Sequence, residues 1–220
     1  MAKRLTNKVA IIGCGPGSLG YITLKALQGI KESDVLVGSK RLLNLFPEVK
    51  ANKILLGKNY RTLLSKIVSL SSRKKVTILV SGDPGFFSYA RLVVGRLGQK
   101  NCEVIPGISC MQLAFAAIGK TWNDAHFMSL HGRRSELEGL VEVVKTHNKV
   151  AVLNDGGISP RLLSHTLIKG GVKDRKIFLC ENLSLENEKV REFNLDSLGK
   201  AEAEGMNVLI FTTQGISSSE

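Results

Sequence analysis

The stretch Lys8-Val9-Ala10-Ile11-Ile12-Gly13-Cys14-Gly15-Pro16-Gly17 decides the fold class, because a short apolar run ends there in a glycine-rich turn. The turn Ser81-Gly82-Asp83-Pro84-Gly85 follows a second apolar run, and Pro106-Gly107-Ile108-Ser109 follows a third. In an open α/β sheet, ligands bind at the carboxyl edge of the strands, where backbone amides and helix N-termini emerge together. These turns therefore predict a ligand site at one edge of such a sheet.

The regions around these turns predict strands that alternate with helices. In the first half, strands are predicted over 8–12, 35–38, 76–80 and 102–105, and helices over 18–30, 87–98 and 109–118. This alternation predicts a mostly parallel sheet. The pattern resets at Gly119-Lys120-Thr121-Trp122-Asn123-Asp124, which divides the chain into domains over 1–119 and 120–220. In the second domain, strands are predicted over 125–130, 150–153, 176–180, 189–193 and 207–212, with helices over 136–146 and 159–168.

The composition is that of a folded α/β enzyme, with 43% hydrophobic and 23% charged residues among 220. No apolar run approaches the roughly 20 residues that span a bilayer, so we expect a cytoplasmic protein without membrane contact. The cysteines form no C-x-x-C pair, which argues against a zinc cluster or a redox dithiol. They are predicted to be small buried hydrophobic residues: Cys14, Cys102, Cys110 and Cys180.

The net charge of +12 attracts anions such as nucleic acid, phosphate or a polycarboxylate. Aromatic residues make up only 5% of the chain and form no stacking platform for single-stranded nucleic acid, so we expect no nucleic-acid partner. A solvated basic surface accounts for the charge as well as an anionic ligand does, and this choice stays open.

The pair Gly13-x-Gly15 also begins the fingerprint of dinucleotide-binding proteins. The third glycine of that fingerprint is replaced by Ser18. In dinucleotide-binding proteins the acidic residue that binds the ribose follows the second strand, whereas Asp34 precedes it. Pro16 also removes a backbone donor from the loop that would hold pyrophosphate. An NAD-dependent oxidoreductase therefore remains an alternative that these residues disfavour.

A set of ordered motifs resembles the tetrapyrrole methylases, S-adenosylmethionine-dependent enzymes of corrin and sirohaem synthesis. The resemblance covers essentially the whole chain, and its five ordered motifs lie at 13–17, 22–27, 34–38, 81–84 and 106–109. The resemblance implies two α/β domains of the class III methyltransferase type, with the active site in the interdomain cleft. Stretches at 37–43, 81–88 and 129–133 resemble the branch that methylates carbon 5 of a precorrin in cobalamin synthesis.

The resemblance also implies a pocket for S-adenosyl-L-methionine. Its expected lining residues are Gly15, Pro16, Gly82, Asp83, Phe86, Ser109 and Cys110, with Leu153 and Asn154 from the second domain. A glycine at position 82 lets the chain approach a ligand, and Asp83 can accept hydrogen bonds from a hydroxyl or an amine. A plain turn at Gly82 and core packing of Phe86 are the alternatives, and Cys110 replaces a serine often found in the family.

The expected chemistry needs no covalent nucleophile and no metal, because the sulfonium already carries an activated methyl group. The enzyme aligns the reacting atoms and shields them from water. His131 is predicted to accept the proton that leaves the macrocycle, although a purely structural histidine is an alternative. Basic residues predicted to pair with carboxylates of a tetrapyrrole substrate, or else to be solvated, are Lys40, Arg41, Arg133 and Arg134.

Further expectations follow from the resemblance. Some relatives carry a second unit that methylates carbon 15, and because this chain ends at Glu220, a carbon-5 reaction alone is expected. A homodimer is expected by analogy. A ribosomal RNA 2′-O-methyltransferase of the same fold remains an alternative, which predicts salt-dependent RNA binding. Asp155-Gly156-Gly157 follows another strand and forms either a wall of the cleft or a simple turn.

Overall fold

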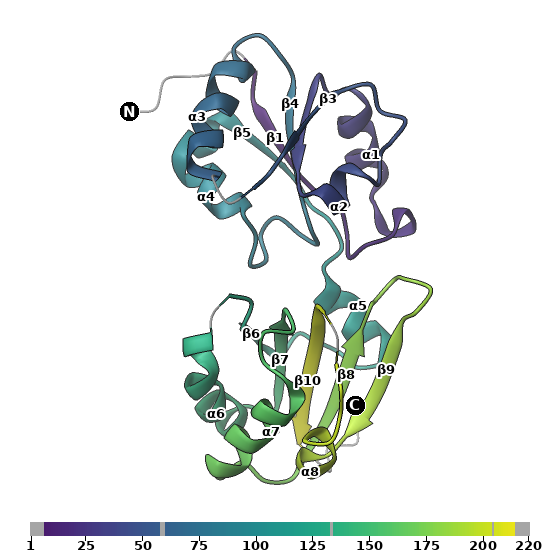
Figure 1. Ribbon diagram of the computed structural model, residues 1–220, viewed down its shortest axis with the longest axis vertical. Coiled ribbons are helices and arrows are strands. Elements are labelled where there is room, and N and C mark those ends of the chain that lie inside the picture. The colour runs from purple at the N-terminus through teal and green to yellow at the C-terminus, as the bar shows by residue number, and fades with distance from the viewer. Residues whose placement is uncertain (1–6, 58–59, 133, 204, 214–220) are drawn as a thin grey trace. The chain divides into compact units, whose positions relative to one another are not determined.

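The computed structural model describes residues 7–57, 60–132, 134–203 and 205–213 (Figure 1). The chain forms two compact units, Met1–Ser109 and Cys110–Glu220, and each contains a five-stranded sheet. Within the described ranges, no helix has the length and apolar character needed to cross a membrane. We call these parts unit 1 and unit 2.

Unit 1 is built on a parallel sheet, as the alternation of strands and helices predicted. The strand order is β3-β2-β4-β1-β5. The strands are β1 (Val9–Gly13), β2 (Val35–Gly38), β3 (Asn52–Leu55), β4 (Val76–Val80) and β5 (Cys102–Ile105). Strands β2 and β4 are buried along their whole length, because helices cover both faces of the sheet.

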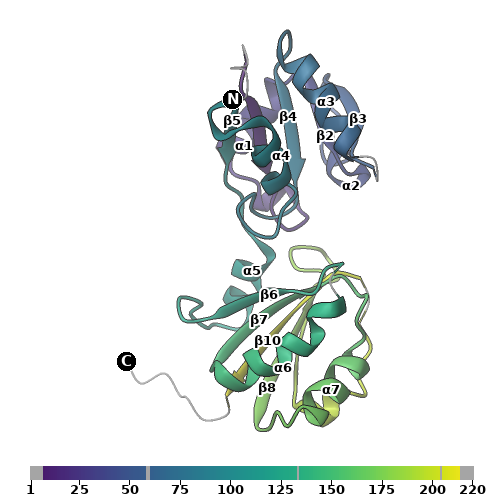
Figure 2. The ribbon, with the colours of Figure 1, turned by 90° about the vertical axis from the view of Figure 1, so that its left-hand side faces the viewer.

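Two apolar clusters hold the helices of unit 1 to opposite faces of its sheet (Figures 1 and 2). Successive strand residues point to opposite faces, so Ile11 and Ile12 belong to different clusters. Helices α1 (Leu24–Lys31) and α2 (Lys40–Leu43) pack in the cluster of Ile12. Helices α3 (Tyr60–Ser71) and α4 (Ala90–Leu97) pack in the cluster of Ile11. Short 3-10 turns lie at η1 (Leu19–Tyr21) and η2 (Gln99–Asn101).

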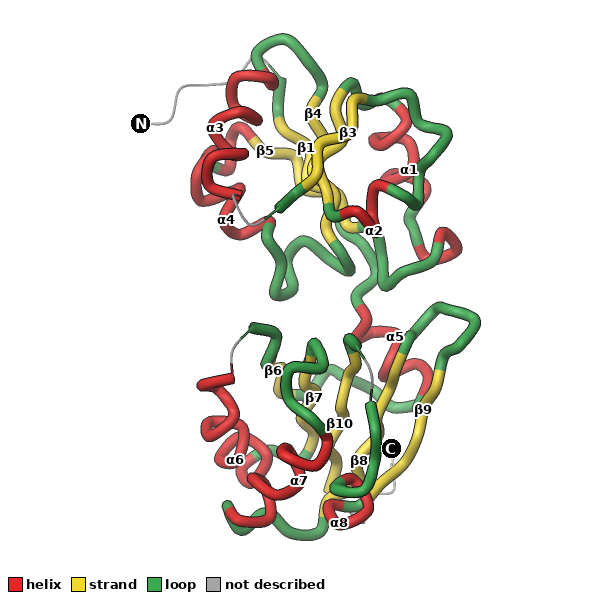
Figure 3. The backbone as a smooth tube through the Cα atoms, viewed as in Figure 1, coloured by secondary structure: helices red, strands yellow, loops and turns green. Residues whose placement is uncertain are grey.

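Unit 2 contains a mixed sheet in the order β6-β7-β10-β8-β9 (Figure 3). Strands β6 and β7 are parallel, whereas the other neighbours are antiparallel. The strands are β6 (His126–Ser129), β7 (Lys149–Asn154), β8 (Arg175–Glu181), β9 (Lys189–Phe193) and β10 (Asn207–Thr213). One apolar cluster joins the sheet to α6 (Leu137–Thr146), α7 (Pro160–Lys169) and α8 (Leu195–Leu198). A 3-10 turn, η3 (Arg134–Glu136), precedes α6.

The structure differs from the sequence prediction in several elements. The helix predicted from residue 18 begins at Leu24, because the side chain of Thr23 accepts a hydrogen bond from the backbone of Ala26 and caps the helix. The sequence analysis did not predict β3, α2, α3 or α8. The helix α5 (Cys110–Ala117) lies in unit 2, where it contacts β10. The expected boundary after residue 119 therefore follows α5, whereas the two units divide before it.

Candidate functional site

The turns after β1 and β4 are joined at the carboxyl edge of the unit 1 sheet. The backbone N–H of Cys14 donates to the carbonyl of Val80 at 2.9 Å, which continues the pairing of these strands. The N–H of Gly82 then donates to the carbonyl of Gly15 at 2.8 Å, and these glycines form an isolated antiparallel bridge. Two of the predicted turns therefore form one connected edge.

The third turn packs against the other two through glycine backbones. A Cβ atom at Gly107 would lie 2.5 Å from the carbonyl oxygen of Gly82, and one at Gly13 would lie 2.6 Å from the same oxygen. Gly82 adopts a φ of +62°, a backbone conformation that favours glycine, but a Cβ there would meet Ser109 only at 3.6 Å. The close approach is therefore between protein backbones, at positions that the sequence analysis did not single out for it.

Asp83 connects two of these turns through both oxygens of its carboxylate. Its Oδ1 accepts a hydrogen bond from Gly85 N–H at 2.7 Å, and its Oδ2 accepts one from Gly107 N–H at 3.0 Å. The sequence predicted that Asp83 accepts hydrogen bonds from a ligand. Each carboxylate oxygen retains a further acceptor site, so the backbone contacts leave that role open.

The side chains around Asp83 include an aromatic pair and a buried serine. The rings of Phe86 and Phe87 meet edge to face, with centroids 4.7 Å apart. Phe86 is half-buried, whereas Phe87 is exposed and adopts a φ of +46°. Pro16 is half-buried after β1, and Ser109 is buried after β5.

All four cysteines are free thiols, and the predicted burial is confirmed for Cys14, Cys102 and Cys180. Cys110 is half-buried at the first position of α5. Burial raises the pKa of Cys14 to about 12, although the charge of Arg41 opposes this shift. Burial also raises the pKa of Cys110. These cysteines are therefore protonated near neutral pH, and none is an activated nucleophile.

The basic residues predicted to bind carboxylates lie in two separate parts of the chain. Ser39 caps α2, which begins with Lys40 and Arg41, and both basic side chains are exposed. The guanidinium of Arg41 donates a hydrogen bond to the hydroxyl of Ser81, so Arg41 lies at the carboxyl edge of unit 1. Arg133 lies outside the described residues, and only the backbone of Arg134 is described.

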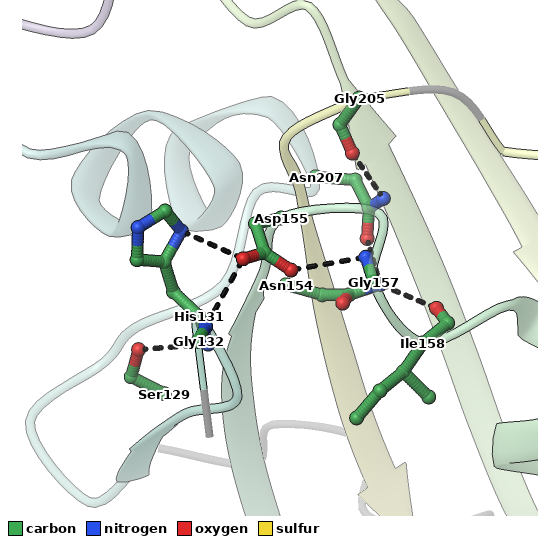
Figure 4. A network of polar contacts seen from close by, with 9 residues as sticks. All are labelled: Ser129, His131, Gly132, Asn154, Asp155, Gly157, Ile158, Gly205 and Asn207. Carbon is green, nitrogen blue, oxygen red and sulfur yellow. Dashed lines mark hydrogen bonds and ion pairs between the residues drawn. The ribbon is translucent and has the colours of Figure 1, made fainter. Parts of the chain in front are cut away.

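The carboxyl edge of unit 2 brings His131 together with Asp155 (Figure 4). His131 follows β6, Asp155 follows β7, and the Nδ1 atom of His131 lies 3.2 Å from Oδ2 of Asp155. Oδ2 also accepts a hydrogen bond from Gly132 N–H at 3.0 Å, and Oδ1 accepts one from Gly157 N–H at 3.0 Å. The sequence indicates the turn at Asp155 but no partner for its side chain.

The surroundings of Asp155 favour its ionised form. The hydrogen bond from Gly157 lowers the pKa of Asp155 most, followed by the hydrogen bond from Gly132 and the charge of His131, and partial burial opposes these effects. The His131 side chain is 58% exposed, whereas that of Asp155 is 26% exposed. This edge therefore carries an accessible imidazole whose Nδ1 atom contacts a less exposed carboxylate.

Asn154, which precedes Asp155, has an unsatisfied acceptor. Its Nδ2 atom donates to the carbonyl of Ile158 at 2.8 Å and to Oδ1 of Asn207 at 3.3 Å. Asn154 is 2% exposed, and its Oδ1 atom has no hydrogen-bond partner among the described residues. Buried acceptors are rarely left unpaired, so this oxygen suits a donor on a bound ligand or water. Leu153 is also buried, and its carbonyl accepts from Leu130 N–H at 2.8 Å.

In the part of the chain that the structure describes, no group of three or more histidine, cysteine, aspartate or glutamate residues is arranged to hold a metal ion. The predicted ligand-lining residues of unit 1 thus lie in the turns after β1, β4 and β5, whereas Lys40 and Arg41 lie on α2 after β2. Among the described residues of unit 2, His131 follows β6, Leu153 and Asn154 end β7, and Cys110 begins α5.

Comparison with known proteins finds similarity over most of the chain. A family model described as Tetrapyrrole (Corrin/Porphyrin) Methylases matches residues 8–199. A protein of Methanocaldococcus jannaschii named probable cobalt-precorrin-7 C(5)-methyltransferase is 34% identical over 211 residues. The alignment covers 92% of this chain and 97% of that protein.

Solved structures share the fold. The precorrin-6Y methylase of cobalamin biosynthesis from Archaeoglobus fulgidus matches with a TM-score of 0.72 and 24% identity, over 95% of this chain and 99% of that one. The uroporphyrin-III C-methyl transferase of Thermus thermophilus, complexed with S-adenyl homocysteine, matches with a TM-score of 0.75 and 20% identity, over 94% and 92%. These likenesses confirm the predicted α/β fold with two sheets.

Proposed function

The chain belongs to the tetrapyrrole (corrin/porphyrin) methylases, and from that premise we propose that it methylates carbon 5 of a cobalt-precorrin. The observation that carries this proposal is the 34% identity to the Methanocaldococcus jannaschii protein, which extends over nearly the whole of both chains. The relatives of this chain support a methyltransferase of cobalamin biosynthesis. The carbon position and the cobalt in the substrate are the proposed part.

We assign S-adenosylmethionine as the methyl donor. When bound, it supplies a methyl group already activated by a sulfonium. The residues proposed to hold it are Gly15, Pro16, Gly82, Asp83, Phe86 and Ser109 in unit 1, and Cys110, Leu153 and Asn154 in unit 2. The unpaired Oδ1 of Asn154 suits the amine donors of such a ligand. The remaining acceptor sites of Asp83 suit its hydroxyl or amine groups.

We propose that basic side chains bind the substrate through its carboxylates. Lys40 and Arg41 are exposed on α2, and Arg41 lies at the carboxyl edge through its hydrogen bond to Ser81. A guanidinium can form paired hydrogen bonds with one carboxylate, which orients the ligand as well as attracting it. We propose the same carboxylate-binding role for Arg133 and Arg134. The net charge of +12 supports a polyanionic substrate.

We propose that His131 accepts the proton that the macrocycle loses. A carbon–carbon bond forms at the ring, the carbon–sulfur bond of the donor breaks, and a proton must leave to restore the conjugated ring. Histidine changes its charge near neutral pH, and the His131 side chain is exposed enough to reach a ligand.

Mass spectrometry of a cobalt-precorrin pool incubated with the protein and S-adenosylmethionine tests this function. We expect one methyl group to be added per tetrapyrrole, together with an equal amount of S-adenosylhomocysteine. Omission of either the protein or the methyl donor provides the control. If S-adenosylhomocysteine binds but no tetrapyrrole gains a methyl group, the substrate assignment is wrong.

The relatives reported above favour neither the NAD-dependent oxidoreductase nor the ribosomal RNA methyltransferase. A reaction at carbon 5 without a second methylation at carbon 15 remains part of our proposal. So does a homodimer in the cytoplasm, which light scattering would test by giving twice the chain mass of 23.9 kDa.

A further inference from the structure

We propose that Asp155 is a positioning residue, which fixes the imidazole of His131 in the tautomer and orientation needed to accept the substrate proton at Nε2. This inference rests on the proposed function, because it assumes that His131 takes up that proton. It adds a residue to which the sequence analysis gave no chemical role.

The carboxylate of Asp155 is fixed independently of the histidine. Gly157 N–H holds Oδ1 from within the same turn, and Gly132 N–H holds Oδ2 from the loop after the neighbouring strand β6, each at 3.0 Å. The main chain of His131 is held as well, since its N–H donates to the hydroxyl of Ser129 at 3.3 Å. The imidazole therefore meets a carboxylate whose position is set by backbone amides.

This contact determines which nitrogen of the neutral imidazole carries the proton. An ionised carboxylate only accepts hydrogen bonds, so the Nδ1 atom 3.2 Å from Oδ2 must carry hydrogen to bind it. The proton of the neutral ring then lies on Nδ1, and the lone pair lies on Nε2. Figure 4 shows Nδ1 directed toward Asp155 and the other ring nitrogen directed away from it.

The same carboxylate stabilises the product of proton transfer. When Nε2 takes a proton from the macrocycle, the ring becomes an imidazolium beside an ionised aspartate. The hydrogen bonds that favour ionised Asp155 come from backbone amides, which stay in place during the reaction. Asp155 therefore keeps its charge throughout, and the proton remains on His131 until it passes to solvent.

Asp83 in unit 1 shows what the same arrangement looks like without a histidine. Its Oδ1 accepts from Gly85, two residues later, as Oδ1 of Asp155 accepts from Gly157. Its Oδ2 accepts from a glycine of another edge loop, as Oδ2 of Asp155 accepts from Gly132. If Asp155 only joined loops, the imidazole contact would have no effect on the chemistry.

The variant Asp155→Asn separates these possibilities. Asparagine keeps the shape of the side chain and the acceptor for Gly157, but its amide nitrogen replaces Oδ2, so it donates hydrogen toward His131 and no longer accepts from Gly132 N–H. It therefore favours the ring tautomer with the proton on Nε2, where the substrate proton must go. We expect kcat to fall about 100-fold, within the range of a general base, with little change in KM for S-adenosylmethionine.

Two readouts keep the proposal independent of folding and of the substrate assignment. Nitrogen NMR of labelled imidazole at pH 8 should show the proton of His131 on Nδ1 in the native protein and on Nε2 in Asp155→Asn. Asp83→Asn serves as the matched control and should leave that signal unchanged. In the background of His131→Gln, Asp155→Asn should cause no further loss of kcat, because it acts through the imidazole.

An unchanged tautomer in Asp155→Asn would overturn the proposal, and so would an equal loss of kcat with and without His131. If the native protein methylates no precorrin, the proposed function fails. The NMR comparison still decides whether Asp155 sets the tautomer of His131.

Discussion

The two units place an aspartate at the carboxyl edge of sheets that are built differently. Asp83 follows β4 of a parallel sheet, and Asp155 follows β7 of a mixed sheet. Each carboxylate accepts one backbone N–H from two residues later and another from a different edge loop. Only Asp155 also contacts an imidazole. The turn itself is therefore structural, and the added histidine marks where we place proton transfer.

The edges also differ in how closely their loops pack. In unit 1 the backbones at Gly13, Gly82 and Gly107 touch, and no Cβ atom fits at the first or the third. In unit 2 a Cβ atom at Gly132 would meet nothing within 4 Å, although its φ of +63° still favours glycine. In the loop after β7, a Cβ atom at Gly156 would lie 3.0 Å from the carbonyl oxygen of Gly205, so the looser packing of unit 2 is confined to Gly132 in the loop after β6.

The largest difference between the two edges is expected from His131→Gln, which removes the imidazole that only Asp155 contacts. Glutamine keeps hydrogen-bonding capacity but cannot act as a base near neutral pH, so kcat should fall by about 100-fold to 10,000-fold. The side chain is 58% exposed, so Tm should change little. Single-turnover kinetics with a cobalt-precorrin would measure the loss. A variant with the native rate would show that His131 takes no part in proton transfer. Asp155 would then have no role beyond the joining of loops that it shares with Asp83.

The second effect concerns the rigid edge of unit 1. In Gly107→Ala the new Cβ must displace the backbone of Gly82 or Gly13, and we expect a destabilisation of about 1–3 kcal/mol. Gly95→Ala is the matched control, because Gly95 lies in α4 with nothing within 4 Å of its Cβ. It should stabilise the protein by roughly 0.5–1 kcal/mol. Urea unfolding measures both changes, and equal effects would show that the edge of unit 1 tolerates side chains.

A smaller effect is expected from removing the carboxylate of unit 1. Asp83→Ala leaves Gly85 N–H and Gly107 N–H without their acceptor, which should cost about 1 kcal/mol of stability. It also removes a proposed ligand contact, so the affinity for S-adenosylhomocysteine should fall about tenfold, or 1.4 kcal/mol. Calorimetric titration measures this loss. Unchanged affinity would limit Asp83 to joining the turns.

The smallest effect lies in the pH dependence of stability. The pKa of Asp155 is lower in the folded protein than in the unfolded chain, so ionised Asp155 adds to the free energy of unfolding above the unfolded pKa of about 3.9. This contribution is lost as the pH falls through the lower folded pKa. We therefore expect Asp155→Asn to weaken the decrease in Tm between pH 5 and pH 3. An identical decrease in both proteins would contradict the favourable setting of the ionised carboxylate.

The sequence predicted the edge turns well, because glycine and proline fix local backbone geometry wherever they occur. The parallel sheet of unit 1 followed from apolar runs such as β4, which is buried throughout. Strand β3 was missed because three of its four residues are exposed, so it shows no apolar pattern. The expected boundary after residue 119 leaves α5 in the first domain, whereas α5 contacts β10 of unit 2, and the buried residues of the helix do not indicate which sheet they contact.

The pairing of His131 with Asp155 could be found only from the three-dimensional structure. The two residues are far apart in the sequence and meet because β6 and β7 are parallel neighbours whose carboxyl ends share an edge. The available signal was that a polar residue followed each predicted strand. Sequence alone could not show that Gly132 and Gly157 fix the carboxylate, since these contacts depend on backbone direction.

The position of the transferred methyl group tests the proposed function most directly. Carbon NMR of the product formed from a cobalt-precorrin and methyl-labelled S-adenosylmethionine would locate the label on the ring. Our proposal predicts a single labelled methyl group bonded to carbon 5. A label on any other ring carbon, or none on the tetrapyrrole, would contradict it.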